Sequence, residues 1–204
     1  MQFPLSARSA AVLVVDMQNE FVGPNSIFPV ADKEIVFRMQ SFLKVVRDMG
    51  VPVIYTAYRA REGIPPYGPA ATLLAAVREG RAHRGPAADI VPALAPQPGD
   101  LVVHKLKQSG FYGTDMEIIL RALKVDTVII SGVTTNVCCV ATARDAAARD
   151  LSVVFLSDLT ATFDLPGANG KAIPAETVQQ VTCAIVAHSI GEVTTAGDVL
   201  VRLG

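Results

Sequence analysis

Short apolar runs alternate with longer stretches of helical periodicity along most of this chain. Runs rich in Val and Ile predict strands near residues 11–16, 51–56, 101–105, 126–131, 151–156 and 192–195. Helices are predicted over residues 32–49, 115–124, 135–149 and 174–189. Asp32 and Pro174 suit helix starts, and Gly50 suits a helix end. Such alternation is typical of βα units and therefore predicts an α/β fold with a parallel sheet.

The segment from Tyr58 to Gly99 departs from this alternation. It contains seven of the thirteen prolines, and within it only Thr72–Arg78 has a helical pattern. A connection of this length inside a compact domain is usually functional or disordered. We expect a lid or a wall of the functional site here, with a subunit contact as an additional role. The strands on both sides belong to one sheet, so residues 1–204 are expected to form one domain.

The composition narrows the classes of function. Half of the 204 residues are apolar and 18% are charged, which is typical of a well-buried globular protein. A formal net charge of −1 gives no electrostatic reason to expect nucleic acid or an anionic membrane as a partner. The longest apolar runs have the length of strands, and Met1–Arg8 lacks the pattern of a signal peptide. Three cysteines, two of them adjacent, do not make a disulfide framework, so we expect a reducing cytoplasm.

Three reactive side chains each fall at the end of a predicted strand. Asp16 follows the first apolar run, Lys105 ends the third, and Cys138 comes shortly after the fourth. The carboxyl ends of the strands in an open parallel sheet form the crevice where ligands bind. An acid, a cation and a thiol that meet there are the parts needed to make and use a thiolate nucleophile. The pattern indicates an enzyme that works through a covalent intermediate.

Cys138 is the expected nucleophile because it lies where a buried strand leads into a helix. The helix dipole and the first N–H groups favour a thiolate there, and they could also hold an oxyanion. A buried cysteine that only packs is the alternative. Cys139 points about 100° away around the helix, so we interpret it and Cys183 as packing residues. A redox pair of Cys138 and Cys139 stays open as a rival function, although adjacent cysteines form a strained bridge.

Asp16 and Lys105 each have two interpretations. Asp16 is either a general base that takes the thiol proton or a helix N-cap. Lys105 either holds the thiolate and orients the carboxylate, or is a solvated cation at a strand end. His104 alternates to the opposite face of its strand, and no spacing links His83 or His188 to these residues. A cysteine–histidine pair is therefore not supported.

The segments around these residues share a further pattern. They are Leu13–Phe21, Lys105 followed by Ser109–Thr114, and Gly132–Cys138 followed by Ala141–Asp145. In this order and spacing they resemble the isochorismatase-like cysteine hydrolases over most of the chain. The resemblance implies a three-layer Rossmann-like α/β fold, in which a six-stranded, mostly parallel sheet carries helices on both faces. It also implies a homo-oligomer, either a dimer or a tetramer.

The same resemblance implies how the site is built. It assigns a catalytic triad to Asp16, Lys105 and Cys138. It further implies a cis peptide bond between Val133 and Thr134, which would turn the backbone N–H groups of Thr134 and Cys138 into an oxyanion hole.

Two departures from relatives narrow the expected activity. Isochorismatases proper are similar but lack a cysteine at the position of Cys138, so the thiol favours hydrolysis of a C–N bond. Nicotinamidases carry an Asp-x-His metal motif after the second strand, whereas this chain has Tyr55–Ala60 there. We therefore expect no metal and no cofactor. The chain resembles the metal-free amidohydrolases of ureido or carbamoyl compounds, such as ureidoacrylate, biuret or N-carbamoylsarcosine, and the turn before Cys138 is most like the ureidoacrylate type.

The alternatives are a nicotinamidase-like or other small-amide hydrolase, the redox protein, and a binding protein with an inert site. Aromatic residues that could wall the substrate pocket, or could simply be core, are Phe21, Tyr55, Tyr58, Phe111, Tyr112 and Phe163. Arg59 and Arg61 either bind a substrate carboxylate or are solvated. Gln18 and Asn19 either contact a substrate carbonyl or order the turn after Asp16.

Overall fold

The computed structural model describes residues 2–64, 68–69, 74–168 and 170–204. Its main sheet has six strands in the order β3-β2-β1-β4-β5-β8, and all of the paired neighbours run parallel. These strands are β1 (Ala10–Val15), β2 (Val53–Tyr58), β3 (Leu101–Lys105), β4 (Thr127–Val133), β5 (Ser152–Ala161) and β8 (Glu192–Thr194). The predicted parallel α/β sheet is confirmed.

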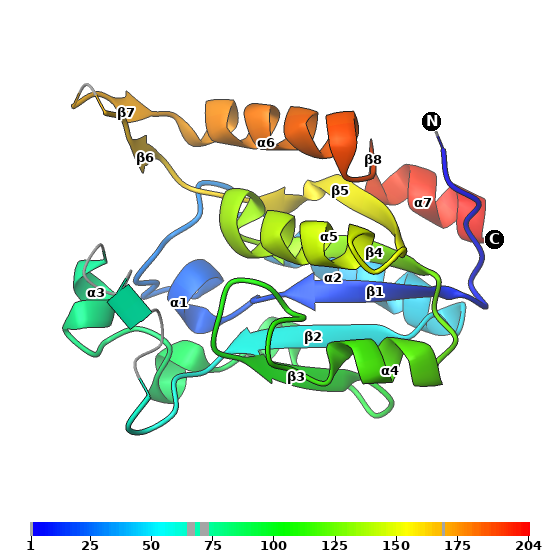
Figure 1. Cartoon of the computed structure of the whole chain (residues 1–204), viewed down its shortest axis with the longest axis horizontal. Coiled ribbons are helices and arrows are strands. Elements are labelled where there is room, and N and C mark those ends of the chain that lie inside the picture. Colours follow the sequence, from blue (N-terminus) through cyan, green and yellow to red (C-terminus); the bar gives the residue numbers. More distant parts are fainter. Residues whose placement is uncertain (1, 65–67, 70–73, 169) are drawn as a thin grey trace.

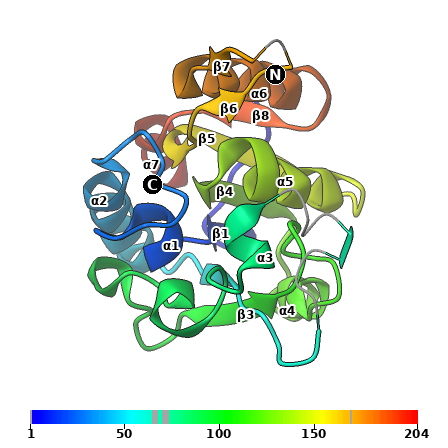
Figure 2. The same cartoon turned by 90° about the vertical axis from the view of Figure 1, so that its left-hand side faces the viewer.

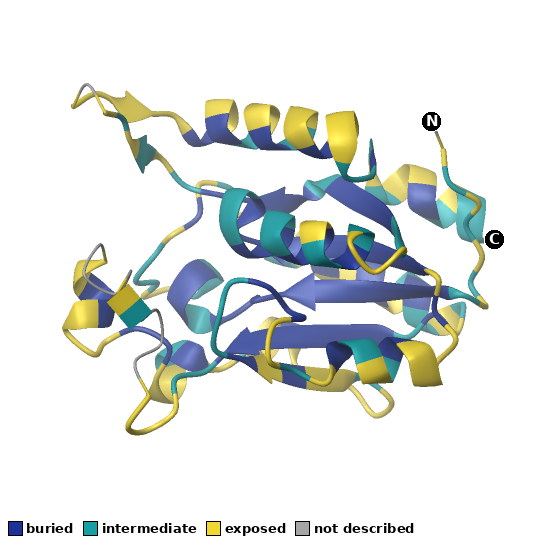
Figure 3. Ribbon diagram, viewed as in Figure 1, coloured by how far each residue is buried: buried dark blue, intermediate teal, exposed yellow. Residues whose placement is uncertain are grey.

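Helices cover both faces of this sheet (Figures 1 and 2). One face carries α2 (Ile35–Asp48) and α7 (Ala196–Leu203), and the other carries α4 (Met116–Ala122), α5 (Val140–Ala147) and α6 (Ala175–Ser189). Side chains of β1 alternate between the two core layers, with Val12 and Val14 under α2 and Leu13 and Val15 on the opposite side. A strand that is buried on both faces needs apolar residues at every position, which explains its unbroken apolar run. The central strands β1, β2 and β4 are buried, whereas the edge strand β3 and the outer helix faces are partly exposed (Figure 3).

The structure differs from the predicted helices in three places. The helix predicted from Asp32 begins at Ile35, and the Asp32 carboxylate instead accepts the backbone N–H of Glu34 at 3.0 Å in the turn before it. The helix predicted over 135–149 starts with a separate π-helical turn, η4 (Thr135–Cys139). Helix α7 was not predicted, because its eight residues bury a single side chain fully, that of Val199.

The segment after β2 contributes short elements beside the carboxyl ends of the strands (Figure 2). They are α3 (Ala75–Arg78), η2 (Gly85–Ala88) and η3 (Pro92–Leu94), next to α1 (Asn19–Val22). Of the predicted helical stretch Thr72–Arg78, the last part forms α3, whereas Thr72 and Leu73 lie outside the described residues. A small hairpin of β6 (Leu165–Pro166) and β7 (Ala172–Ile173) follows β5. Among the helices described, none has the length and apolar character to cross a membrane.

A glycine lets β4 approach β1 next to the predicted site. Gly132 has a φ of +109°, and a Cβ atom there would lie 2.0 Å from the carbonyl oxygen of Val15. We expect Gly132→Ala to lower the free energy of unfolding by at least about 3 kcal/mol, because it adds both strain and overlap. Urea denaturation measures this loss. Gly99→Ala is the matched control, since Gly99 has a φ of +98° but open space around it; equal losses in the two variants would contradict the close-approach argument.

Candidate active site

The carboxyl ends of β1, β3 and β4 bring three reactive side chains into contact. Asp16 directly follows β1, Lys105 ends β3, and Cys138 lies in η4 just beyond β4. The Lys105 Nζ atom is 2.8 Å from Asp16 Oδ2 and 3.4 Å from Cys138 Sγ. Asp16, Lys105 and Cys138 are 0%, 1% and 4% exposed. The structure thus brings together the three residues that the strand ends predicted.

The Asp16 carboxylate is fixed through both of its oxygens. Oδ2 contacts Lys105, and Oδ1 accepts a hydrogen bond of 2.7 Å from the Thr56 hydroxyl on β2. Asp16 has a φ of +48°, in the left-handed region that few residues other than glycine adopt. Thr56 was not among the predicted site residues, although side chains along a strand alternate in direction and Tyr58, two positions on, faces the same site.

Lys105 is a fully enclosed cation. Besides Asp16 and Cys138, its Nζ contacts the carbonyl oxygens of Lys107 at 3.0 Å and Gln108 at 2.9 Å. Nζ also lies 4.5 Å from the centre of the Tyr58 ring. Burial lowers the pKa of Lys105, but Asp16 and Cys138 more than offset burial, so the pKa is raised. Lys105 therefore keeps its proton and acts as a fixed positive charge.

The surroundings of Cys138 favour a protonated thiol over a thiolate. Burial raises the pKa of Cys138 to about 12, because the effect of burial and of Asp16 exceeds the lowering by Lys105. This differs from the thiolate that its position at a helix start led us to expect. Use of the sulfur as a nucleophile therefore requires a neighbour that accepts the proton. Asp16 is a carboxylate in the right place, because it contacts Lys105 at 2.8 Å and its hydrogen bond with Cys138 is one cause of the raised pKa of the thiol.

The turn that carries Cys138 has an unusual backbone. The peptide bond between Val133 and Thr134 is cis. The Thr134 carbonyl accepts the N–H groups of Val137 and Cys139, each at 3.1 Å, which lie on either side of Cys138. An α-helix would offer this carbonyl to the N–H of Cys138. The π-helical turn instead directs its hydrogen bonds around Cys138, and π-helical turns often occur at functional sites.

Comparison with known proteins agrees with this architecture. Residues 10–196 match the Isochorismatase domain. The chain belongs to the isochorismatase family. Ureidoacrylate amidohydrolase RutB of Caulobacter vibrioides is 28% identical over 177 residues, which are 77% of this chain and 79% of that protein. The same enzyme of Rhizobium rhizogenes is 29% identical over 95% of this chain and 83% of its own length.

Solved structures of this family superpose over nearly the whole chain. A cysteine hydrolase from Pseudomonas syringae pv. phaseolicola has a TM-score of 0.92 and 38% identity, covering 98% of this chain and 95% of its own. An isochorismatase family protein from Desulfovibrio vulgaris has a TM-score of 0.79 and 26% identity, covering 96% of this chain and 100% of its own. The predicted Rossmann-like α/β fold is therefore confirmed.

Gln179 of this isochorismatase-family chain, which was not among the predicted site residues, holds the turn that carries Cys138 to the sheet. Pairing of β4 with β5 jumps from Ile130–Phe155 to Gly132–Thr160. The Gln179 Nε2 donates to the carbonyls of Ser157 and Thr160 in this bulge, both at 3.1 Å. Its Oε1 accepts from the hydroxyl of Thr135, the first residue of η4, at 2.6 Å. A glutamine on a helix ordinarily indicates a solvated face, so only the fold reveals this role.

Replacing Gln179 with leucine should disturb the turn that carries Cys138. We expect a loss of stability of about 1–3 kcal/mol, because the buried carbonyls lose their donor. A fall in kcat of about tenfold should accompany it as the turn shifts. Thermal unfolding and steady-state kinetics measure the two effects. Gln180→Leu, on the exposed side of the same helix, is the control, and a kcat that is unchanged in folded Gln179→Leu would contradict the role in the turn.

Gln18 and Asn19 order the turn after Asp16. The Gln18 side chain is 0% exposed; it donates to the carbonyls of Tyr58 at 2.9 Å and Ala88 at 2.6 Å and accepts the Tyr58 N–H at 2.8 Å. Asn19 donates to the carbonyl of Pro86 at 2.9 Å. All three hydrogen bonds of Gln18 are internal, so the structure favours the turn-ordering alternative over a substrate contact.

Tyr55 does not face the site, in contrast to the predicted pocket wall. It is 0% exposed in the core layer under α2, while Cys138 belongs to the opposite layer. Its hydroxyl accepts a hydrogen bond of 2.9 Å from Arg47, which also pairs with Asp100. Burial raises the pKa of Tyr55. Side chains alternate between the two faces of a sheet along a strand. Thr56 and Tyr58 point to the site, so Tyr55, an odd number of residues from each, points to the opposite face.

The other residues that were predicted to contact the substrate lie in different parts of the fold. Phe111 is 4% exposed in the same core layer as Cys138, and Phe21 is 7% exposed and stacks on Phe28 at 5.8 Å. Arg59 pairs with Asp89 at 2.6 Å, so its charge is already engaged. Arg61 and Tyr112 are exposed. No cluster of metal-binding side chains occurs in the described part of the chain.

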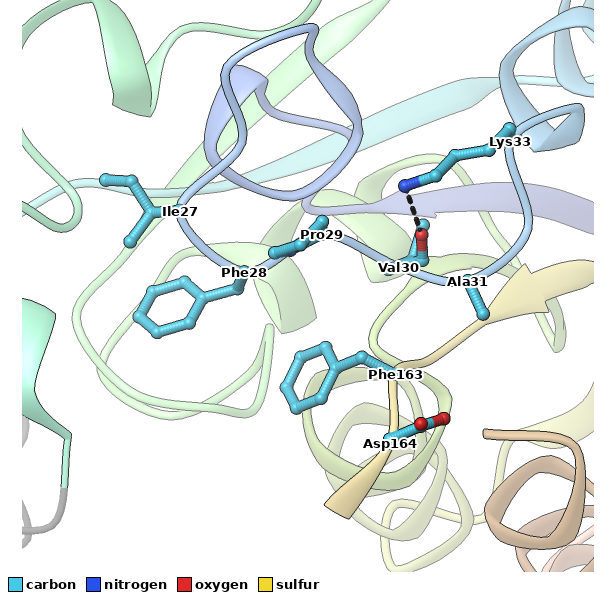
Figure 4. Close-up of a pocket in the computed structure, with 8 residues that line it drawn as sticks. All are labelled: Ile27, Phe28, Pro29, Val30, Ala31, Lys33, Phe163 and Asp164. Carbon is cyan, nitrogen blue, oxygen red and sulfur yellow. Dashed lines mark hydrogen bonds between the residues drawn. The ribbon is translucent and has the colours of Figure 1, made fainter. Parts of the chain in front are cut away.

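Phe163 lines an open pocket of about 500 Å³ together with Phe28. The two rings lie near one another, and at the far end Lys33 donates to the Val30 carbonyl at 2.8 Å (Figure 4). Asp164 lines the same pocket and accepts the backbone N–H of Ala175 at 2.8 Å. Both charged side chains are thus engaged, which leaves a mainly apolar wall that includes the two aromatic rings.

Proposed function

We propose that this chain is a cysteine amidohydrolase that cleaves the C–N bond of a small amide, ureido or carbamoyl compound. The buried contact chain from Asp16 through Lys105 to Cys138 is the observation that carries this proposal. The family membership supports it, as do the names of relatives, which include ureidoacrylate amidohydrolases and a cysteine hydrolase. The nicotinamidase-like alternative uses the same triad on a different small amide.

In the proposed reaction, Cys138 Sγ attacks the substrate carbonyl while its proton passes to Asp16. Lys105 stabilises the negative charge as it moves from the carboxylate toward the sulfur. The backbone N–H groups of Thr134 and Cys138 receive the oxyanion. Asp16 then returns the proton to the leaving nitrogen, and water cleaves the acyl–sulfur bond to release the acid and regenerate the thiol. Each role is filled by this chain's own groups, so we propose a reaction that runs without a metal or cofactor.

The redox alternative has less support. Burial raises the pKa of Cys139 well above its ordinary value, and the pKa of Cys138 is about 12. Thiol–disulfide exchange needs a thiolate, which both sites disfavour in the resting protein.

Ammonia release across a panel of primary amides and ureido acids tests the proposed activity. The best substrate is then mixed with enzyme, quenched during turnover and examined by peptide mass spectrometry, where we expect the acyl group on Cys138. Alkylation of Cys138 with iodoacetamide should abolish turnover. Undiminished hydrolysis by enzyme that is fully alkylated at Cys138 would exclude the covalent mechanism.

We also propose that the protein acts in a reducing cytoplasm as a homo-oligomer, either a dimer or a tetramer. All three cysteines are present as thiols. Val181 and Ile185 on α6 are 52% and 43% exposed and offer apolar surface for a contact between copies. Sedimentation velocity of the purified chain measures the assembly directly.

A further inference from the structure

A second buried pair of ionisable side chains lies outside the proposed triad. Glu20 belongs to α1, and His83 belongs to the segment between β2 and β3; both are 0% exposed. Glu20 Oε1 is 2.8 Å from His83 Nδ1, and Glu20 Oε2 accepts the backbone N–H of His83 at 2.8 Å. One carboxylate therefore fixes both the ring and the backbone of His83, which has a φ of +60°. Sequence spacing gave no link between these two residues.

This pair reaches the proposed catalytic cation through one aromatic ring. The His83 ring stacks on Tyr58 with 4.0 Å between the ring centres and 27° between their planes. The Tyr58 ring in turn lies 4.5 Å from Lys105 Nζ. Tyr58 is 0% exposed, and its hydroxyl donates to the carbonyl of Leu106, next to Lys105. Contacts thus run without a break from Glu20 to the ammonium group between Asp16 and Cys138.

Packing alone does not account for such a pair. Burial of a carboxylate beside an imidazole is costly unless the two are hydrogen-bonded, and apolar residues of similar size would fill the space at less cost. The two oxygens of Glu20 instead set the position of His83 from two directions. An ammonium group near an aromatic face is attracted to the ring, and this attraction grows when water is excluded. The position of the Tyr58 ring therefore influences where Lys105 is held.

We propose that Glu20 and His83 are positioning residues that hold the Tyr58 ring against Lys105. The segment after β2 then contributes to the chemistry by fixing the catalytic cation as well as by forming a wall. This inference rests on the proposed amidohydrolase function for its kinetic consequences. The geometric part, which concerns Lys105 and Cys138, does not depend on a substrate.

The decisive variant is His83→Asn. Asparagine tolerates the left-handed backbone and offers a side-chain N–H to Glu20, but it has no ring to stack on Tyr58. We expect the variant to fold with a lower unfolding temperature, because a buried ring is lost, and to show kcat lowered about tenfold with KM changed less than twofold. Arg84→Asn, the same substitution at the exposed neighbouring residue, is the matched control. An unchanged kcat in folded His83→Asn would overturn the proposal.

A double-variant comparison tests whether the effect passes through Tyr58. Tyr58→Leu removes the ring, so His83→Asn added to it should cause no further loss of kcat. Independent losses that multiply in the double variant would overturn the proposal. If His83→Asn does not fold, Glu20→Met is judged by the same criteria, because methionine has a similar length but replaces neither the contact to the His83 ring nitrogen nor the contact to its backbone N–H.

A substrate-free readout separates this inference from the proposed function. We expect iodoacetamide to alkylate Cys138 several-fold more slowly in His83→Asn than in wild type, because a poorly held Lys105 stabilises the thiolate less. Peptide mapping distinguishes Cys138 from Cys139 and Cys183. If no amide is hydrolysed by the wild type, the proposed function fails, yet the alkylation rates still decide the positioning role: equal rates in the two proteins would refute it.

Discussion

Replacement of Cys138 with alanine is expected to lower kcat/KM for the best amide substrate by at least about four orders of magnitude. Loss of the attacking atom removes the covalent pathway, and the residual rate comes only from binding and from the oxyanion hole. Cys138→Ser should be similarly inactive, because its hydroxyl gives up a proton less readily than the thiol in the same buried position. Steady-state ammonia release, corrected for folded protein, measures both variants.

Cys139→Ala is the matched control for this loss. Cys139 is 0% exposed in the core, so its removal should cost stability but leave kcat/KM within a few-fold of wild type. If Cys139→Ala were as inactive as Cys138→Ala while folded, the redox pair would gain support. Substantial hydrolysis by Cys138→Ala would contradict the covalent mechanism itself.

The strands and the meeting of the triad could be predicted from sequence for one physical reason. Parallel strands buried on both faces need continuous apolar runs, and each run stops where the chain reaches the carboxyl edge of the sheet. Asp16 and Cys138 come after the buried strands β1 and β4, and Lys105 ends the partly exposed edge strand β3, so their proximity follows from topology without knowledge of any long-range contact. The parallel order of β3, β2, β1 and β4 then brings them together.

The supporting residues could not be predicted, because their roles depend on pairings between distant segments. Glu20 and His83 are 63 positions apart, and Gln179 meets Thr135 across 44 positions. No local pattern records such contacts. The prediction that Tyr55 walls the pocket was wrong for a simpler reason. Alternation along β2 places Tyr55 on the opposite face from Thr56 and Tyr58, but the sequence does not say which of the two faces carries the site.

The resting thiol, rather than a resting thiolate, gives the strongest test of Asp16. Burial and the neighbouring Asp16 raise the pKa of Cys138 to about 12, so near neutral pH the thiol strongly predominates and a proton acceptor is needed for attack. We expect Asp16→Asn to lower kcat/KM about 10³-fold near neutral pH, within the range that general base catalysis contributes. The variant should also lose about 3–5 kcal/mol of stability, since Lys105 stays buried without its carboxylate.

The rate of the Asp16→Asn variant should increase with pH, in contrast to the rate of the wild type. Without Asp16, the remaining rate should rise about tenfold for each pH unit above neutrality, as the thiolate fraction of Cys138 grows. The rise should level off below pH 12, because the charge of Asp16 is one cause of the raised pKa of Cys138 and the variant lacks it. Wild type should lack this steep rise, because its proton moves within the site. Asp115→Asn, at an exposed position, controls for the substitution, and a flat profile in Asp16→Asn at near wild-type rate would remove Asp16 from the proton path.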